Sequence, residues 1–122
     1  ESIAHDNFKG KVVKANDTGT VITGLLTGHP VRGLRNTLTK EFEKAERYEG
    51  GQEKPDFDRL EDLGKGALKR AVIDGDTKNS SMMAGQIAGL IKSDQQSCDE
   101  IIQELMTETK QVLNERSKVW GA

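Results

Sequence analysis

One run of residues in this sequence has the composition of a β-strand, and this scarcity limits the folds open to the chain. The run Thr20–Thr23 is β-branched at every position, and β-branched side chains pack well on a pleated surface. Elsewhere, apolar residues recur at helical spacing and glycines interrupt them at short intervals. The pattern predicts an α+β fold that is mostly helical.

The expected helices are separated by turns and loops. Ser97 is the expected cap of the last helix, with Glu100 in the capping-box position. We expect an ordered loop from Leu25 to Asn36, a linker over 50–56 and a turn at Asp74–Asp76. The predicted helices are His5–Ala15; Thr37–Glu49; Asp56–Ile73, with a break near Gly64 and Gly66; Met82–Ile91, capped by Ser80 or Ser81; and Cys98–Val119.

The chain has few large apolar side chains with which to fill a core of its own. Of its 122 residues, 34% are apolar, 4% are aromatic and 31% are charged. A domain of this size buries only about two thirds of the surface that its unfolded chain exposes. We therefore expect the chain to complete its core against the rest of a larger protein or against a second copy. Glu1 in place of an initiator methionine suggests truncation, although maturation or cloning would give the same start.

Charge and cysteine content exclude several classes of function. The 18 basic and 20 acidic residues are mixed along the chain, which argues against nucleic acid as a partner. The apolar runs fall far short of the ~20 residues that cross a bilayer, and no signal peptide is visible. The lone Cys98 fits a reducing cytoplasm, and with two separated histidines it predicts no metal site. Asp74 and Asp76 lack the remaining ligands of a calcium loop.

Residues 80–91 form the most unusual segment. In the expected helix, Ala84 and Ala88, like Gly85 and Gly89, recur four apart and share a face. Small residues on one face allow another group to approach the backbone closely. Gln86 is the only strongly polar residue between Met82 and Leu90. Composition alone favours tight packing against another helix over the alternative, in which the segment borders a ligand.

Residues 27–36 are the second candidate segment. His29 has an unperturbed pKa near neutrality, but no carboxylate or nucleophile lies near it in sequence, which favours a structural or capping role. Arg32 and Arg35 have the geometry to bind a phosphate or carboxylate in a bidentate manner. The alternative that we favour from composition is that they hold this loop to acidic residues.

Three segments, in order, resemble FMN-dependent enoyl-acyl-carrier-protein reductases. Residues 1–5 (ESIAH) resemble the segment after the last barrel strand, and residues 27–41 (TGHPVRGLRNTLTKE) resemble the loop and helix beyond the barrel. Residues 74–90 (DGDTKNSSMMAGQIAGL) resemble the Met-Ala-Gly-Gln-containing segment near that family's C-terminus. Nitronate monooxygenases share the fold and a related Gly-Gln segment. His29 before Pro30, together with the helix that follows, favours the reductases.

The resemblance implies a TIM barrel that holds FMN, with a smaller domain inserted near the C-terminus. Residues 1–19 would end the barrel, 20–96 would form the small domain, and 97–122 would be a C-terminal helix that packs back on the barrel. TIM-barrel active sites lie at the carboxyl ends of the strands. Those strands would precede Glu1, so we expect no catalytic residue in this chain and no activity from it alone.

The resemblance also implies cofactors, partners and site residues. FMN and NADH or NADPH would reduce an enoyl thioester on acyl carrier protein, in a cytoplasmic homodimer. Met82, Ala84, Gly85 and Gln86 would border the flavin, while His29 and Arg32 would contact the substrate. The alternatives are a nitronate monooxygenase fragment and a self-associating helical module without enzyme activity.

Overall fold

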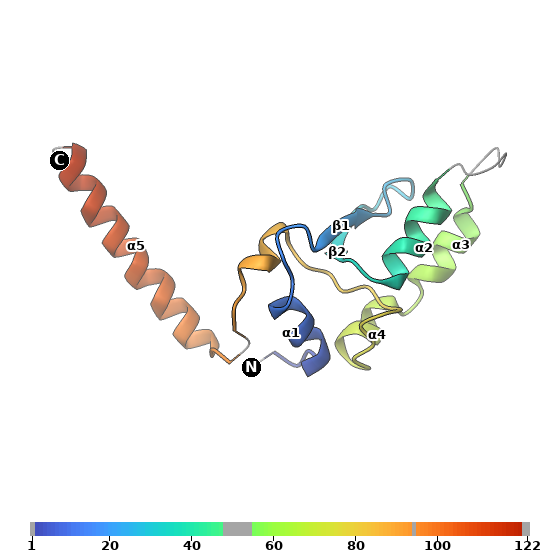
Figure 1. Ribbon diagram of the computed structural model, residues 1–122, viewed down its shortest axis with the longest axis horizontal. Helices are drawn as coiled ribbons and strands as arrows, with labels where there is room; N and C mark the ends of the chain where they lie inside the picture. The colour runs from blue at the N-terminus through green and yellow to red at the C-terminus, as the bar shows by residue number, and fades with distance from the viewer. Residues whose placement is uncertain (1, 48–54, 94, 121–122) are drawn as a thin grey trace.

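The computed structural model describes residues 2–47, 55–93 and 95–120, and it has the predicted α+β, mostly helical character. Figure 1 shows α2 and α3 side by side next to a two-stranded hairpin, with α1 and α4 below it and α5 extending away. The elements are α1 (Asp6–Val13), β1 (Thr20–Thr23), β2 (Val31–Leu34), α2 (Thr37–Glu46), α3 (Phe57–Gly64), α4 (Ala67–Val72), the 3-10 helix η1 (Gln86–Leu90) and α5 (Cys98–Trp120).

The hairpin corrects the expectation of a loop from Leu25 to Asn36. β1 is the predicted strand, and it pairs with β2 in antiparallel register, with Thr20 opposite Leu34. Arg32 and Gly33 have little strand propensity, so β2 was not visible from local composition. Its backbone groups are satisfied by neighbours on both sides, which stabilises the strand despite its composition.

The expected helix Met82–Ile91 is also wrong, because its first residues extend along the free edge of β2. The Leu34 N–H donates to the Met82 carbonyl at 2.9 Å, and the Ala84 N–H donates to the Arg32 carbonyl at 3.2 Å. Only η1 is helical, so the expected α-helical face of small residues does not form. Gly85 and Gly89 lower helix stability by roughly 1 kcal/mol each, whereas pairing with β2 satisfies the backbone.

The remaining helices lie close to their predicted positions. α1 starts after His5, whose imidazole accepts a hydrogen bond from the Asn7 N–H. α2 begins at Thr37 as predicted but ends at Glu46, before the expected end at Glu49, because the Arg47 backbone is extended. Residues 48–54, which include the predicted linker residues 50–54, lie outside the described residues. In α5, the Ser97 hydroxyl accepts from the Glu100 N–H, and the Glu100 carboxylate accepts from the Ser97 N–H, which confirms the capping box.

The predicted break between α3 and α4 is present at Gly66. Gly66 has φ +65°, a conformation that glycine adopts without the clash that a Cβ would create. The Arg70 guanidinium spans the break, donating to the carbonyls of Lys65 at 2.6 Å, Leu63 at 3.4 Å and Asn79 at 2.9 Å. These bonds fix α4 against the end of α3 and against the segment that leads to Met82.

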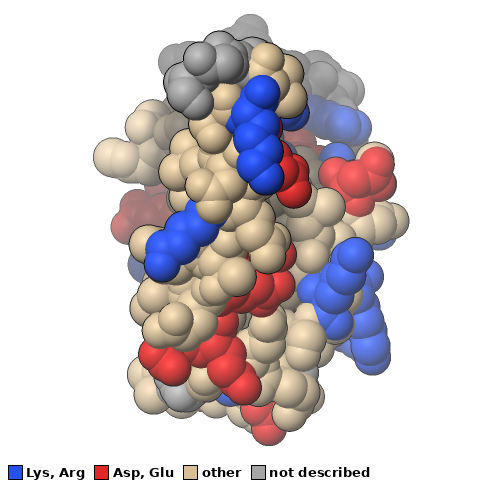
Figure 2. Space-filling view, turned by 90° about the vertical axis from the view of Figure 1, so that its left-hand side faces the viewer, with Lys and Arg blue, Asp and Glu red and all other residues tan. Residues whose placement is uncertain are grey.

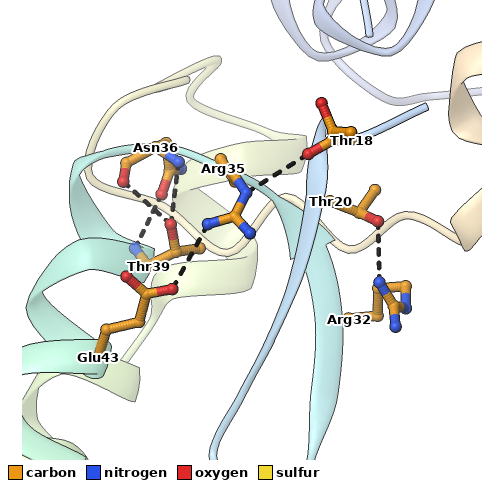
Figure 3. Close-up of polar contacts among 7 residues, drawn as sticks. All are labelled: Thr18, Thr20, Arg32, Arg35, Asn36, Thr39 and Glu43. Atoms are coloured by element: carbon orange, nitrogen blue, oxygen red, sulfur yellow. Dashed lines mark hydrogen bonds and ion pairs between the residues drawn. The ribbon is translucent and has the colours of Figure 1, made fainter. Parts of the chain in front are cut away.

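Asn36 joins the start of α2 to the loop before residue 82. Its side-chain oxygen accepts from the Thr39 N–H at 3.0 Å, while the Thr39 hydroxyl accepts from the Asn36 N–H (Figure 3). The Asn36 amide nitrogen donates to the carbonyl of Ser80 at 2.7 Å and to that of Thr77 at 3.3 Å. One side chain therefore caps a helix and holds a distant loop.

The core is small, and much apolar surface stays exposed. Leu34, Ala71, Met82 and Ala88 form a buried cluster to which α1 adds partly buried side chains. The apolar stripe of α5 is uncovered by the described residues, with Leu105 60% exposed. On the face shown in Figure 2, acidic and basic side chains are interspersed among uncharged ones. Among the described residues, no helix is long and apolar enough to cross a membrane.

We expect Asn36→Ala to lower the free energy of unfolding by about 2–4 kcal/mol, since it removes a helix cap and leaves two carbonyls without their donor. Asn36→Ser keeps a capping oxygen but loses the amide donor, so its loss should be smaller. Urea denaturation of the two variants and the parent measures both values. Equal losses would show that the loop contacts contribute the whole effect and the cap nothing.

Candidate functional site

A cavity of about 520 Å³ lies between the hairpin, α2, α3, α4 and residues 81–83. Its volume falls within the roughly 300–1,000 Å³ of small-molecule sites in proteins. The lining comes from separate parts of the chain: Thr23, Gly24, Leu26, Thr27, His29, Val31 and Gly33 from the hairpin and its loop; Leu38, Thr39 and Phe42 from α2; Phe57, Leu60, Glu61 and Gly64 from α3; Ala67 and Leu68 from α4; and Ser81, Met82 and Met83.

One wall of the cavity depends on a close backbone contact at Gly33. A Cβ at this position would lie 2.9 Å from the Met82 carbonyl oxygen, so a side chain there would force the two segments apart. Thr23, Val31 and Gly33 share the cavity face, because alternate residues of a strand point to the same side. The absence of a side chain at Gly33 therefore lets the extended segment at Met82 close this side of the cavity.

The helices supply an apolar lining that is buried at some positions and half-exposed at others. Leu38 and Leu60 are buried, at 5% and 1% exposure, whereas Phe57 and Leu68 are 52% and 48% exposed. The cavity is therefore apolar within and bordered by large side chains that reach solvent. From sequence these residues fit the apolar faces of two packed helices, and no local signal separates such a face from a cavity lining.

The polar groups of the lining differ in whether they can form a hydrogen bond with a ligand. The Thr27 hydroxyl donates to the Gly24 carbonyl at 2.8 Å, and the Thr39 hydroxyl donates to the Asn36 carbonyl at 3.0 Å. His29 and Glu61 are the ionisable residues of the lining, and both are exposed. Within the described part of the chain the His29 imidazole makes no hydrogen bond, so it is available to a ligand.

The predicted substrate-binding residues separate in the structure. His29 lines the cavity, but Arg32 does not, and its guanidinium donates to the Thr20 hydroxyl at 3.0 Å (Figure 3). Arg35 forms an ion pair with Glu43 at 3.5 Å and donates to the Thr18 carbonyl at 3.4 Å. The interpretation that this region is held to an acidic residue is therefore confirmed for Arg35.

The four predicted flavin-binding residues also divide between the interior and the surface. Met82 is 2% exposed and lines the cavity, and Ala84 packs against the core cluster. Gly85 and Gln86 lie on the surface beside Met83, which is 45% exposed. Within the described residues the Gln86 amide has no hydrogen-bond partner. Residues 83–87 thus present an accessible strip of apolar and amide groups that adjoins the cavity at Met83.

Asp76 has a structural role in the turn that precedes this strip. Its carboxylate accepts from the backbone N–H groups of Asn79 at 2.9 Å and Lys78 at 2.8 Å, and these bonds hold the pKa of Asp76 below its ordinary value. The predicted turn at Asp74–Asp76 is thus present, with Gly75 at φ +69°. The described residues contain no cluster of three or more metal-binding side chains.

Comparisons with known proteins agree on one family. A family model described as nitronate monooxygenase matches residues 1–108. A probable nitronate monooxygenase of Staphylococcus saprophyticus is 25% identical over 114 residues, which are 93% of this chain and 30% of that protein. The structure of FabK from Thermotoga maritima matches 95% of this chain and 35% of that chain, with 33% identity and a TM-score of 0.83. A methionine-to-alanine variant of that FabK matches 95% and 32% of the two chains, with 29% identity and a TM-score of 0.73. The chain thus spans about a third of the length of these relatives.

We expect Gly33→Ala to destabilise the protein by about 1–3 kcal/mol, because the added Cβ meets a backbone carbonyl that cannot move without breaking the pairing. Gly64→Ala is the matched control in the same cavity lining, since its Cβ would meet nothing within 4 Å. That variant should be neutral or up to about 1 kcal/mol more stable, as alanine favours helix. Thermal unfolding measures the stability of both variants. An unchanged stability of Gly33→Ala would contradict the close contact between Gly33 and the Met82 carbonyl that closes this side of the cavity.

Proposed function

Because the chain belongs to the nitronate monooxygenase family, we propose that it is the C-terminal part of an FMN-dependent enoyl-acyl-carrier-protein reductase. The observation that carries this proposal is the match to FabK, with a TM-score of 0.83 and 33% identity over 95% of the chain. The likeness to the probable nitronate monooxygenase is lower, at 25% identity. The rest of the proposed enzyme would be a TIM barrel that holds FMN and supplies the catalytic residues.

In the proposed reaction, electrons pass from NADH or NADPH to the double bond of an enoyl thioester carried on acyl carrier protein. FMN supplies the hydride chemistry when it is bound, and the protein supplies position and electrostatics. The strip at residues 83–87 fits this role because it is open. Met83 and Gln86 are exposed, and a Cβ at Gly85 would meet nothing within 4 Å.

We assign different tasks to the four predicted flavin-binding residues, Met82, Ala84, Gly85 and Gln86. Gln86 would donate a hydrogen bond from its amide to the flavin or to the bound thioester, and Gly85 would allow a flat ring to approach the backbone. Met82 and Ala84 are held in the interior by the core, so they would position this strip rather than touch the cofactor. Arg32 is bonded to Thr20, which makes His29 the better candidate for substrate contact.

The exposed stripe of α5 supports a partner surface beyond the described residues. Ile102, Leu105 and Leu113 are each more than half exposed, and burying such side chains stabilises a protein by about 1.5–3 kcal/mol each. We propose that the barrel of the same protein covers this stripe, in a cytoplasmic enzyme that forms a homodimer. A second copy of α5 is the alternative cover, and it corresponds to a self-associating module without enzyme activity.

The activity test uses the full-length protein, purified and characterised by its visible spectrum and intact mass. We expect a flavin spectrum and NADH- or NADPH-dependent reduction of a crotonyl thioester, measured against consumption of an alkyl nitronate with oxygen. Nitronate oxidation is the second candidate function, because both the family model and the curated relative carry that description. Nitronate consumption without thioester reduction would replace our proposal with that function, and a colourless protein would exclude both.

A substitution at Gln86 tests the role of the exposed strip. We expect Gln86→Ala in the full-length enzyme to lower kcat/KM by about tenfold or to weaken FMN binding, since a hydrogen bond contributes about 0.5–1.5 kcal/mol, or more to a charged group. Gln111→Ala, on the polar side of α5, is the matched control and should change neither value. Unchanged turnover and flavin affinity in Gln86→Ala would remove this residue from the site.

A further inference from the structure

We propose that the cavity between the hairpin and α2–α4 binds the acyl chain of the thioester substrate, an inference that rests on the reductase function proposed above. The cavity adjoins the strip at residues 83–87, because Met83 belongs to both, and of the four predicted flavin-binding residues only Met82 lines the cavity. It would therefore determine which acyl chains the enzyme accepts, while the adjoining strip would border the flavin beside the double bond that is reduced.

The chemistry of the lining favours a hydrocarbon chain as the occupant. Phe42, Leu60 and Ala67 line the cavity, and the hydroxyls of Thr27 and Thr39 are already bonded to backbone carbonyls. These hydroxyl donors are therefore engaged, so a polar ligand would gain little from them. An acyl chain needs no hydrogen bond and gains free energy from each methylene that leaves water.

The rim of the cavity matches the other end of such a substrate. His29 and Glu61 are exposed members of the lining, and the His29 imidazole is available as a hydrogen-bond donor. A thioester carbonyl accepts hydrogen bonds, so His29 would bind the polar head while the chain extends between the helices. A small apolar molecule without a polar head would leave this group unused.

The exposed rim residues also indicate that something covers them. Phe57 and Leu68 line the cavity at about half exposure, and Leu26 is 44% exposed. Grouped apolar side chains at a cavity mouth are typical of a binding site. The competing occupant is a side chain from the rest of the longer protein, which would fill the cavity permanently and make it indifferent to the substrate.

The test introduces a larger side chain at the rim of the cavity, in the full-length holoenzyme, to reduce the space available to an acyl chain. Leu68→Trp adds bulk at a half-exposed lining position, where the helix tolerates a larger side chain. Ile73→Trp is the matched control, since Ile73 is 53% exposed at the end of the same helix and lies outside the lining. Each protein is assayed with a crotonyl thioester and a dodecenoyl thioester, and its binding of saturated dodecanoyl thioester is measured by calorimetry.

We expect Leu68→Trp to lower the ratio of kcat/KM for dodecenoyl over crotonyl thioester by more than about tenfold. Each methylene kept out of an apolar site costs about fourfold in affinity, so exclusion of two methylenes suffices. Dodecanoyl thioester should bind correspondingly more weakly, and Ile73→Trp should match the parent in both measurements. Phe57→Ala is the second variant, which should also disfavour the long chain because it removes apolar contact.

The outcomes separate this inference from the proposed function. Equal chain-length ratios and equal dodecanoyl affinities in the two tryptophan variants would overturn the acyl-chain assignment, as would losses that affect both thioesters alike. If the full-length protein reduces no thioester but binds dodecanoyl thioester and loses that binding in Leu68→Trp, the reductase function fails while the acyl site stands. Flavin content, measured in every variant, shows whether the fold is intact.

Discussion

The arrangement of this chain depends on the backbone pairing of Met82–Ala84 with β2. Two hydrogen bonds, between Leu34 and Met82 and between Ala84 and Arg32, join segments that are far apart in sequence. The pairing places Met82 in the core, orients the strip at Gln86 outward and completes one wall of the cavity. Gly33 makes it feasible, and Asn36 and Arg70 hold the intervening loop in position from its two sides.

Some elements of the fold could be predicted from residues that are neighbours in the sequence. The β-branched run gave β1, glycine at position 66 gave the break between α3 and α4, and Ser97 with Glu100 gave the start of α5. β2 and the extended segment at Met82 were missed for one reason. Their stability comes from hydrogen bonds to each other and to β1, and long-range pairing leaves no trace in local composition. The glycines near residue 85 already weakened the helical alternative.

The candidate site likewise contains residues that could be identified from sequence motifs and residues that only the structure reveals. His29 and Met82 were identified from motifs, and both line the cavity. Their predicted roles, in substrate binding and flavin binding, are still proposals. Phe57 and Leu68 carry the same periodic pattern as core residues, and their half exposure becomes visible only when the helices are placed. The shortage of large apolar residues did predict an incomplete core, and α5, with its uncovered stripe, shows where that incompleteness lies.

The positions of Thr20 and Met82 have a consequence for how such proteins diversify. The two residues lie on either side of Leu34 in neighbouring rows of the sheet, so the chain enters and leaves the cavity-bearing unit about 10 Å apart. A unit whose ends are close together tolerates exchange and changes in length without disturbing its host. Insertions or deletions within residues 20–83 would therefore leave the two ends of this unit in place, whereas exchange of the whole unit would also have to match Leu34, Ala71 and Met82 to the side chains of α1 that pack against them.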